Sequence, residues 1–190
     1  MIEYEMMIPP FKLVKFEEMN KKQVQEYFDW YIGQISYRLS LLLNTIKEDN
    51  IDVDFDYSIE SLIPLWEWYE TKISYRKLED SEYQSRLSNH PKWMKDYIDD
   101  KDLSWSTLMY CMDVALYFAE VIIRHNATIR WGYFTKPKNR ADVNQPVLLG
   151  FRYNEDLNPR LIVENCARRS VKERLSTRLY DMYYTWMKYL

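Results

Sequence analysis

The chain has 190 residues, a formal net charge of −3, an aromatic set of 17 Tyr, 7 Trp and 7 Phe, and only three glycines. Gly33, Gly132 and Gly150 lie too far apart to form a phosphate-binding loop, and the tight turns of an all-β barrel or propeller would need many more glycines. Length and composition therefore favour a single, mainly helical α+β domain over residues 1–190.

The N-terminal part predicts an irregular lead-in followed by helices. Residues 1–17 mix apolar and charged positions around two adjacent prolines, whereas residues 18–126 are expected to be mainly helical. Asn20 is placed to cap a helix whose apolar residues recur at three- and four-residue steps from Val24 to Ile46. A glycine inside a helix costs about 1 kcal/mol relative to alanine, so Gly33 predicts a closely packed neighbour.

An acidic loop follows this helix over residues 48–60. Its centre alternates Asp52, Asp54 and Asp56 with apolar residues. The alternation is similar to the start of a calcium-binding loop, but the central glycine and the terminal glutamate of such loops are missing. We therefore expect no metal here, and we regard the three carboxylates as candidate contacts for a basic partner protein.

A second helix and a polar region come next. Ser58 or Ser61 caps the helix, which carries an apolar face. Residues 74–103 are polar and poorly periodic. This composition predicts one or two short helices, around residues 79–87 and after Pro91.

A long apolar helix begins at Ser104 or Ser106 and ends near residue 125. The period then changes to two, which predicts strands over residues 128–134 and 147–151. These strands are expected to pair as a small antiparallel two-stranded β element near residues 127–151. The loop between them has about a dozen residues and is long for a hairpin.

The C-terminal region, residues 158–190, is expected to contain helices. Asn158-Pro159 predicts a helical segment through Cys166. Ser170 and Glu173 have the spacing of a capping box, which predicts that the last helix begins there and buries a stripe from Val171 to Leu190.

No pattern in the sequence predicts a catalytic residue, a metal site or a cofactor. Cys111, Cys166, His90 and His125 stand alone, whereas structural zinc sites take their ligands in close pairs. The cysteines are expected to be reduced thiols, with Cys111 in the core. Two acidic residues and no basic run near the N-terminus indicate no secretory signal, and the apolar stretch 114–123 is too short to span a bilayer, so a cytoplasmic protein without a membrane partner is expected.

Charge is divided unevenly along the chain. Residues 1–110 contain 13 Lys and Arg against 21 Asp and Glu, and residues 111–190 contain 13 against 8. The two parts either neutralise each other within the fold or present separate faces to partners.

The most suggestive basic segment runs from Arg124 to Arg140, where cations alternate with aromatic rings. Its candidate contact residues are Arg130, Trp131, Lys136, Lys138 and Arg140. Basic groups beside exposed rings bind single-stranded nucleic acid, and Arg and Trp also anchor protein interfaces. The alternative interpretation is that the rings belong to the core and the charges are solvated loop residues.

Several strings of residues resemble those of small uncharacterised proteins of Firmicute bacteria, some of which look like immunity proteins of toxin systems. The strings are Tyr27–Trp30, Tyr57–Leu62, Pro64–Trp68, Tyr117–Glu120 and Asn144–Leu148. They are mostly helix caps and aromatic core positions, and the resemblance covers the chain from about Asn20 onward. It implies a binding role and no catalytic residue.

These observations lead to one main functional hypothesis and two alternatives. The main hypothesis is a cytoplasmic protein-binding module, of the kind that includes immunity-type inhibitors of toxins, and a homo-oligomer is compatible with it. The first alternative is a single-stranded nucleic-acid-binding protein that uses the basic and aromatic segment. The second is an enzyme of unrecognised type, in which Glu120, His125 and a basic group would converge in a pocket.

Overall fold

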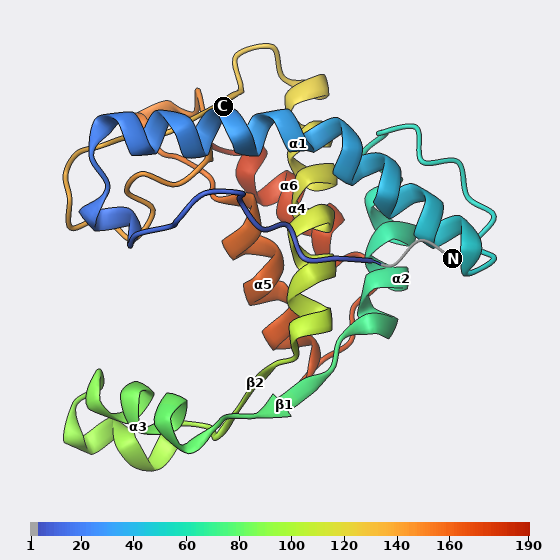
Figure 1. Ribbon diagram of the computed structural model, residues 1–190. Helices are drawn as coiled ribbons and strands as arrows, with labels where there is room; N and C mark the ends of the chain where they lie inside the picture. The colour runs from blue at the N-terminus through green and yellow to red at the C-terminus, as the bar shows by residue number, and fades with distance from the viewer. Residues whose placement is uncertain (1–3) are drawn as a thin grey trace.

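A computed structural model describes residues 4–190, which form a mainly helical α+β fold (Figure 1). The helices are α1 (Lys21–Glu48), α2 (Leu62–Lys72), α3 (Asp80–Ser88), α4 (Trp105–His125), α5 (Pro159–Ser170) and α6 (Arg178–Met187), with short 3-10 helices η1 (Phe16–Glu18), η2 (Lys92–Tyr97) and η3 (Arg152–Asn154). The strands β1 (Tyr75–Lys77), β2 (Lys101–Leu103), β3 (Arg130–Gly132) and β4 (Val147–Leu149) form two antiparallel pairs, β1 with β2 and β3 with β4. The predicted lead-in is irregular up to η1, and its first three residues lie outside the described part of the chain.

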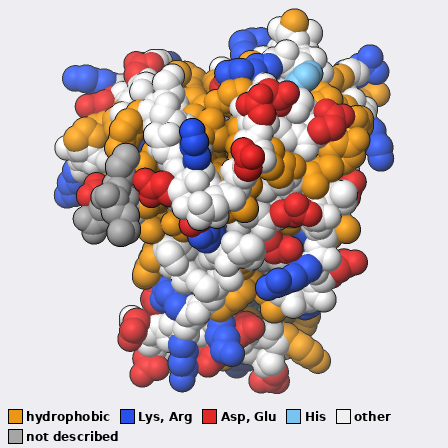
Figure 2. Space-filling view, turned by 90° about the vertical axis from the view of Figure 1, so that its right-hand side faces the viewer, with side chains coloured by type: hydrophobic (Ala, Val, Ile, Leu, Met, Phe, Trp, Pro, Cys, Tyr) orange, Lys and Arg blue, Asp and Glu red, His pale blue; other side chains and the backbone are white. Residues whose placement is uncertain are grey.

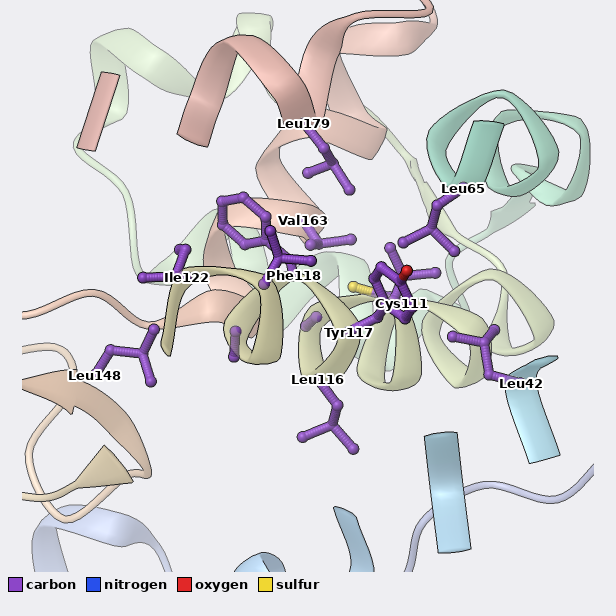
Figure 3. Packing of buried hydrophobic residues seen from close by; sticks show 14 of the residues in the cluster. Leu42, Leu65, Cys111, Leu116, Tyr117, Phe118, Ile122, Leu148, Val163 and Leu179 are labelled. Carbon is purple, nitrogen blue, oxygen red and sulfur yellow. The ribbon is translucent and has the colours of Figure 1, made fainter. Parts of the chain in front are cut away.

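Helix α4 is the centre of the core. The side chain of Ser104 caps it by accepting a hydrogen bond from the Thr107 N–H, as one of the two predicted starts requires. Residues from Val114 to Ile122 are buried almost without a break, because α1, α2 and α5 all pack against this helix (Figure 3). By length and composition α4 is also apolar enough to cross a membrane, but its apolar surface is taken up by these neighbouring helices.

Helix α1 crosses the other helices at one end of the fold (Figure 1). Its start is confirmed: the Asn20 side chain accepts from the Gln23 N–H, and the Gln23 side chain accepts from the Asn20 N–H. The explanation expected for Gly33 is wrong. This residue is exposed, and a Cβ added to it would meet no atom within 4 Å outside the helix backbone.

Residues 73–104 form an arm that projects from the helices (Figure 1). The expected short helices are present as α3 and η2, but the strands β1 and β2 at the base of the arm were not predicted. Each strand has three residues, which is too short for an alternating pattern to be recognised. Trp93 and Tyr97 of η2 are among the most exposed large side chains of the described chain.

The β element near residues 127–151 is confirmed as the antiparallel pair β3 and β4, although both strands are shorter than predicted. Trp131 lies opposite Leu148 in the register. Gly150 follows β4 with a φ of 116°, and a Cβ there would lie 2.2 Å from the Thr128 carbonyl oxygen. The close approach of these two backbone segments therefore requires glycine at position 150.

The predicted start of the last helix is wrong. Ser170 is the last residue of α5, its hydroxyl donates to the Cys166 carbonyl, and α6 begins only at Arg178. Val171 and Leu175, expected to be buried, are 62% and 39% exposed. The buried side of α5 continues beyond Cys166 through Ala167 to Ser170, so Ser170 ends this helix and does not cap the next one.

Candidate functional site

The acidic loop connects α1 to α2 and lies on the face shown in Figure 2. Asp52 and Asp54 are exposed, and neither forms an ion pair or a side-chain hydrogen bond with any residue from 4 to 190. Asp56 is exposed as well, but its carboxylate accepts a hydrogen bond from the Ser58 N–H, and hydrogen bonding by the Ser58 side chain and by this N–H lowers its pKa. Asp49, at the start of the loop, is paired with Lys72 at 2.7 Å.

The loop belongs to a longer acidic stretch. Residues 48–71 contain eight Asp and Glu and no Lys or Arg. Red carboxylate side chains are accordingly spread over the upper half of the face in Figure 2, with apolar side chains between them. Ion pairs do little to offset this charge from the basic part of the chain: among the described residues, only Arg38–Asp113 and Arg168–Asp102 join residues 1–110 to residues 111–190. Within residues 4–190 the two parts are therefore joined by few ion pairs.

Two hollows flank the acidic loop, one mainly apolar and the other mainly polar. One, of about 500 Å³, is lined by Val53, Pro64 and Trp68 and has Glu67 at its edge. The other, of about 400 Å³, lies between the loop and the end of α1 and includes Asp52 and Asp54. Val53 borders both hollows and is 39% exposed, so the loop offers carboxylates beside accessible apolar surface.

The far end of the loop is fixed to α4. The ring of Tyr57 stacks on that of Tyr117 with centroids 4.6 Å apart, and the Tyr57 N–H donates to the Tyr117 hydroxyl. The guanidinium of Arg124 lies over the Tyr57 ring, 3.6 Å from its centroid. These contacts hold Tyr57 in a left-handed conformation with a φ of 63° and so fix the direction in which the loop returns to α2.

The aromatic rings of the basic segment are used within the fold. Trp131 is half-buried with its ring edge-on to Tyr31, at a centroid distance of 5.6 Å. Tyr133 packs on Phe28, and its hydroxyl donates to Gln25. The rings therefore face α1, in agreement with the core interpretation, and they do not form a free row on which bases could stack.

The cations of the same segment have mixed roles. Arg140 pairs with the buried carboxylate of Asp156 and lies over the Phe134 ring. Arg130, Lys136 and Lys138 are exposed and form no ion pair with the described residues. A nucleic-acid interface at this segment would thus depend on these three charges alone.

The structure does not bring the candidate residues from Arg130 to Arg140 to the acidic loop, although Arg124, at the start of the basic segment, lies over the Tyr57 ring of the loop. Trp131 contacts the first half of α1, whereas the acidic loop follows its last residue, Glu48. The 28 residues of α1 span roughly 40 Å at the usual rise of an α-helix. The acidic and basic candidates therefore belong to opposite ends of this helix.

The residues considered for an enzyme have other contacts. Glu120 lies 3.7 Å from Arg124, and the Nε2 atom of His125 lies 3.1 Å from the Tyr57 carbonyl oxygen. Both cysteines are free and buried, and burial raises the pKa of Cys111 to about 12 and that of Cys166 to about 11. Protonated thiols are poor nucleophiles. Residues 4–190 contain no group of three or more His, Cys, Asp or Glu side chains that could hold a metal ion.

A buried ion pair at the middle of α1 escaped prediction. Arg38 donates from Nε and Nη2 to the two carboxylate oxygens of Asp113, at 2.8 and 2.6 Å, and from Nη1 to the Glu5 carbonyl. The Tyr4 hydroxyl donates to the same carboxylate. The network ties the lead-in to α1 and α4. The sequence pattern that could have indicated this pair is a charged residue within the apolar stripe of each helix, Arg38 in α1 and Asp113 in α4.

A small hollow lies near the N-terminal end of α1. Its volume is about 180 Å³, and its wall combines apolar and polar side chains from the lead-in, α1, α4, the loop before β4 and the start of α5. The polar ones are Tyr27, Tyr31, Gln145, Asn158 and Arg160. Sequence patterns did not indicate this site, because its residues come from distant parts of the chain.

Comparisons with protein-family models, with curated proteins and with solved structures find no match to this chain. The candidate sites are therefore judged on their own geometry.

Proposed function

We propose that this chain is a protein-binding module that contacts a basic partner protein through the acidic loop between α1 and α2. The observation that carries the proposal is the stretch 48–71, which has eight acidic residues and no basic residue. Two of its exposed carboxylates, Asp52 and Asp54, have no partner among residues 4–190. Uncompensated charge of one sign steers a partner of the opposite sign and sets its orientation.

The surroundings of the loop support a protein partner. Protein interfaces bury apolar or aromatic anchors at their centre and place charged groups around them. The loop offers this combination, because the hollow beside Val53 and Trp68 is mainly apolar and its lining also includes the charged groups Asp49, Glu67 and Lys72. Anchoring at Tyr57 limits the entropy that the loop would lose on binding.

The resemblance to immunity-type proteins narrows the proposal. A cytoplasmic immunity protein neutralises a toxin by binding it, and a toxin that acts on nucleic acid presents a basic surface. An acidic binding face would suit such a partner. We therefore propose an inhibitor of a basic toxin as the specific form of this function.

Affinity capture with matched charge variants tests the proposal. The immobilised full chain is exposed to an extract of the source organism at micromolar bait concentration. D52N/D54N/D56N removes three charges from the loop, and E17Q/E18Q/E26Q removes the same number from exposed positions at the other end of α1. We expect a basic protein in stoichiometric amount on the wild-type chain and on the control variant, reduced roughly tenfold or more on the loop variant and weakened by salt.

Two results would contradict this function. One is the absence of any stoichiometric protein partner. The other is a partner that binds the loop variant as well as it binds the wild type. Titration of the same proteins with single-stranded DNA at low salt tests the alternative function: binding that is lost in K136E/K138E and retained in D52N/D54N/D56N would favour it.

A further inference from the structure

The hollow near the N-terminal end of α1 is lined by two tyrosines whose side chains are almost fully buried and whose hydroxyls have no hydrogen-bond partner among residues 4–190. These residues, Tyr27 and Tyr31, are 8% and 4% exposed. Both hydroxyls lie near Arg160: burial raises the pKa of each phenol, and the guanidinium acts in the opposite direction. At neutral pH the two phenols are therefore protonated and able to donate.

The charge of Arg160 is only loosely compensated. Its nearest acceptors are the Gln145 side-chain oxygen at 3.5 Å and Glu164 at 3.7 Å, and Glu164 is itself paired more closely with Arg168, at 2.7 Å. Arg160 is also the second residue of α5, a 12-residue helix whose N-terminal end adds partial positive charge. The positive potential in the hollow thus comes from a side chain and from the helix backbone.

The other polar side chains of the wall are already satisfied. The Asn158 amide donates to Asp142 and to Gln145, and its oxygen caps α5 by accepting from the Leu161 N–H. The Gln145 amide donates to the Ala141 carbonyl. The groups that remain free are two phenol hydroxyls and a guanidinium, and all three are hydrogen-bond donors.

The rest of the wall is apolar. Leu13 and Phe16 from the lead-in, Met112 from α4 and Pro146 before β4 complete the lining. The volume of about 180 Å³ is slightly larger than the cavity of about 150 Å³ that accommodates benzene in a well-studied engineered protein. A molecule that fits must therefore be small, with an apolar body and an acceptor-rich, negatively charged end.

We propose that this hollow is a binding site for a small organic carboxylate, with the carboxylate at Arg160, Tyr27 and Tyr31 and the apolar body against Met112 and Pro146. A charge-assisted hydrogen bond from Arg160 would provide most of the selectivity for an anion. The proposal is independent of the acidic loop, which lies beyond the other end of α1.

Benzoate is the probe for this site, and titration of the full chain followed by NMR shifts of the Arg160 side chain and the Met112 methyl group is the measurement. We expect saturable binding with a Kd of about 1 mM or tighter. Benzyl alcohol has the ring without the charge, and inorganic phosphate has charge without the ring. Both should bind at least about tenfold more weakly, because each lacks one half of the recognised chemistry.

Substitutions test which side chains of the hollow bind the carboxylate. R160Q should weaken benzoate binding roughly tenfold or more, and Y31F severalfold. R168Q is the matched control, because Arg168 is on the same helix, is paired with Glu164 and Asp102, and does not line the hollow. Y31F should leave the thermal midpoint of the free protein unchanged or higher, since the hydroxyl that it removes has no protein partner, and this keeps the test independent of folding.

Free acids and peptide C-termini share a carboxylate, and N-acetylphenylalanine distinguishes them. Tighter binding of benzoate assigns a free acid, tighter binding of N-acetylphenylalanine assigns the end of a peptide, and both support a carboxylate site. Equal binding of benzyl alcohol, tighter binding of phosphate, or benzoate affinity that survives R160Q would overturn it. So would the absence of any shift at Arg160 and Met112 up to tens of millimolar probe, which would leave only water in the hollow.

Discussion

The acidic loop and the hollow lie toward opposite ends of α1, and both contain polar groups without protein partners. At the loop these groups are the exposed carboxylates of Asp52 and Asp54, which water solvates at no cost to folding. At the hollow they are the hydroxyls of Tyr27 and Tyr31, whose side chains are 8% and 4% exposed and which line a recess that a small molecule could enter. The same absence of a partner therefore indicates surface charge in one place and a recessed binding site in the other.

Between the two ends, the buried Arg38–Asp113 pair joins the middle of α1 to α4, and breaking it should have the largest effect. R38L leaves the carboxylate of Asp113 buried without its counter-ion, so we expect the free energy of unfolding to fall by about 3–5 kcal/mol in urea denaturation. R130L, at an exposed position without an ion pair, is the control and should change stability by less than about 0.5 kcal/mol. If the double variant R38L/D113L recovers none of the loss, an unpaired charge is not its cause.

The β3–β4 pair depends on glycine at position 150, where the backbone passes close to Thr128. G150A places a Cβ 2.2 Å from the Thr128 carbonyl oxygen at a φ of 116°, so we expect a loss of about 2–3 kcal/mol in the same denaturation experiment. An alanine that left the unfolding midpoint unchanged would show that β3 and β4 separate at little cost.

At Gly33 in α1 we expect the opposite effect on stability when alanine replaces glycine. No neighbour would meet an added Cβ, and the residue is exposed inside a helix, so G33A should stabilise the protein by about 1 kcal/mol. The measurement is the thermal or urea midpoint against wild type. Destabilisation would mean that the glycine serves a contact outside the single chain, which would make this face of α1 part of an interface.

The smallest effect on stability is expected at the acidic loop. D52N/D54N should change the free energy of unfolding by less than about 0.5 kcal/mol, because both carboxylates are solvated and unpaired. Loss of partner binding without loss of stability would show that these carboxylates contribute to binding and not to the stability of the fold. A large destabilisation would instead indicate that the loop carboxylates support the fold.

Local patterns were sufficient for the main helices. The stripe from Val24 to Ile46 with its Asn20 cap, and the Ser104 cap before α4, correspond closely to the observed elements, because helix periodicity and capping act over a few residues. The antiparallel pair near residues 127–151 was likewise predictable from its change of period. The capping pattern at Ser170 failed because Ser170 is buried as the last residue of α5.

The candidate sites also differ in how far the sequence alone could predict them. Composition and spacing by themselves determined the helix-rich α+β class, the acidic stretch 48–71 and its exposed carboxylates, since these depend on residues close in the chain. Only the tertiary structure decided that the Trp131 ring packs on α1, that Arg38 meets Asp113, and that Tyr27, Tyr31 and Arg160 share one hollow. These arrangements join residues 75 to more than 100 positions apart. The packing of α4 against α1 and α5 brings them together, which no local pattern encodes.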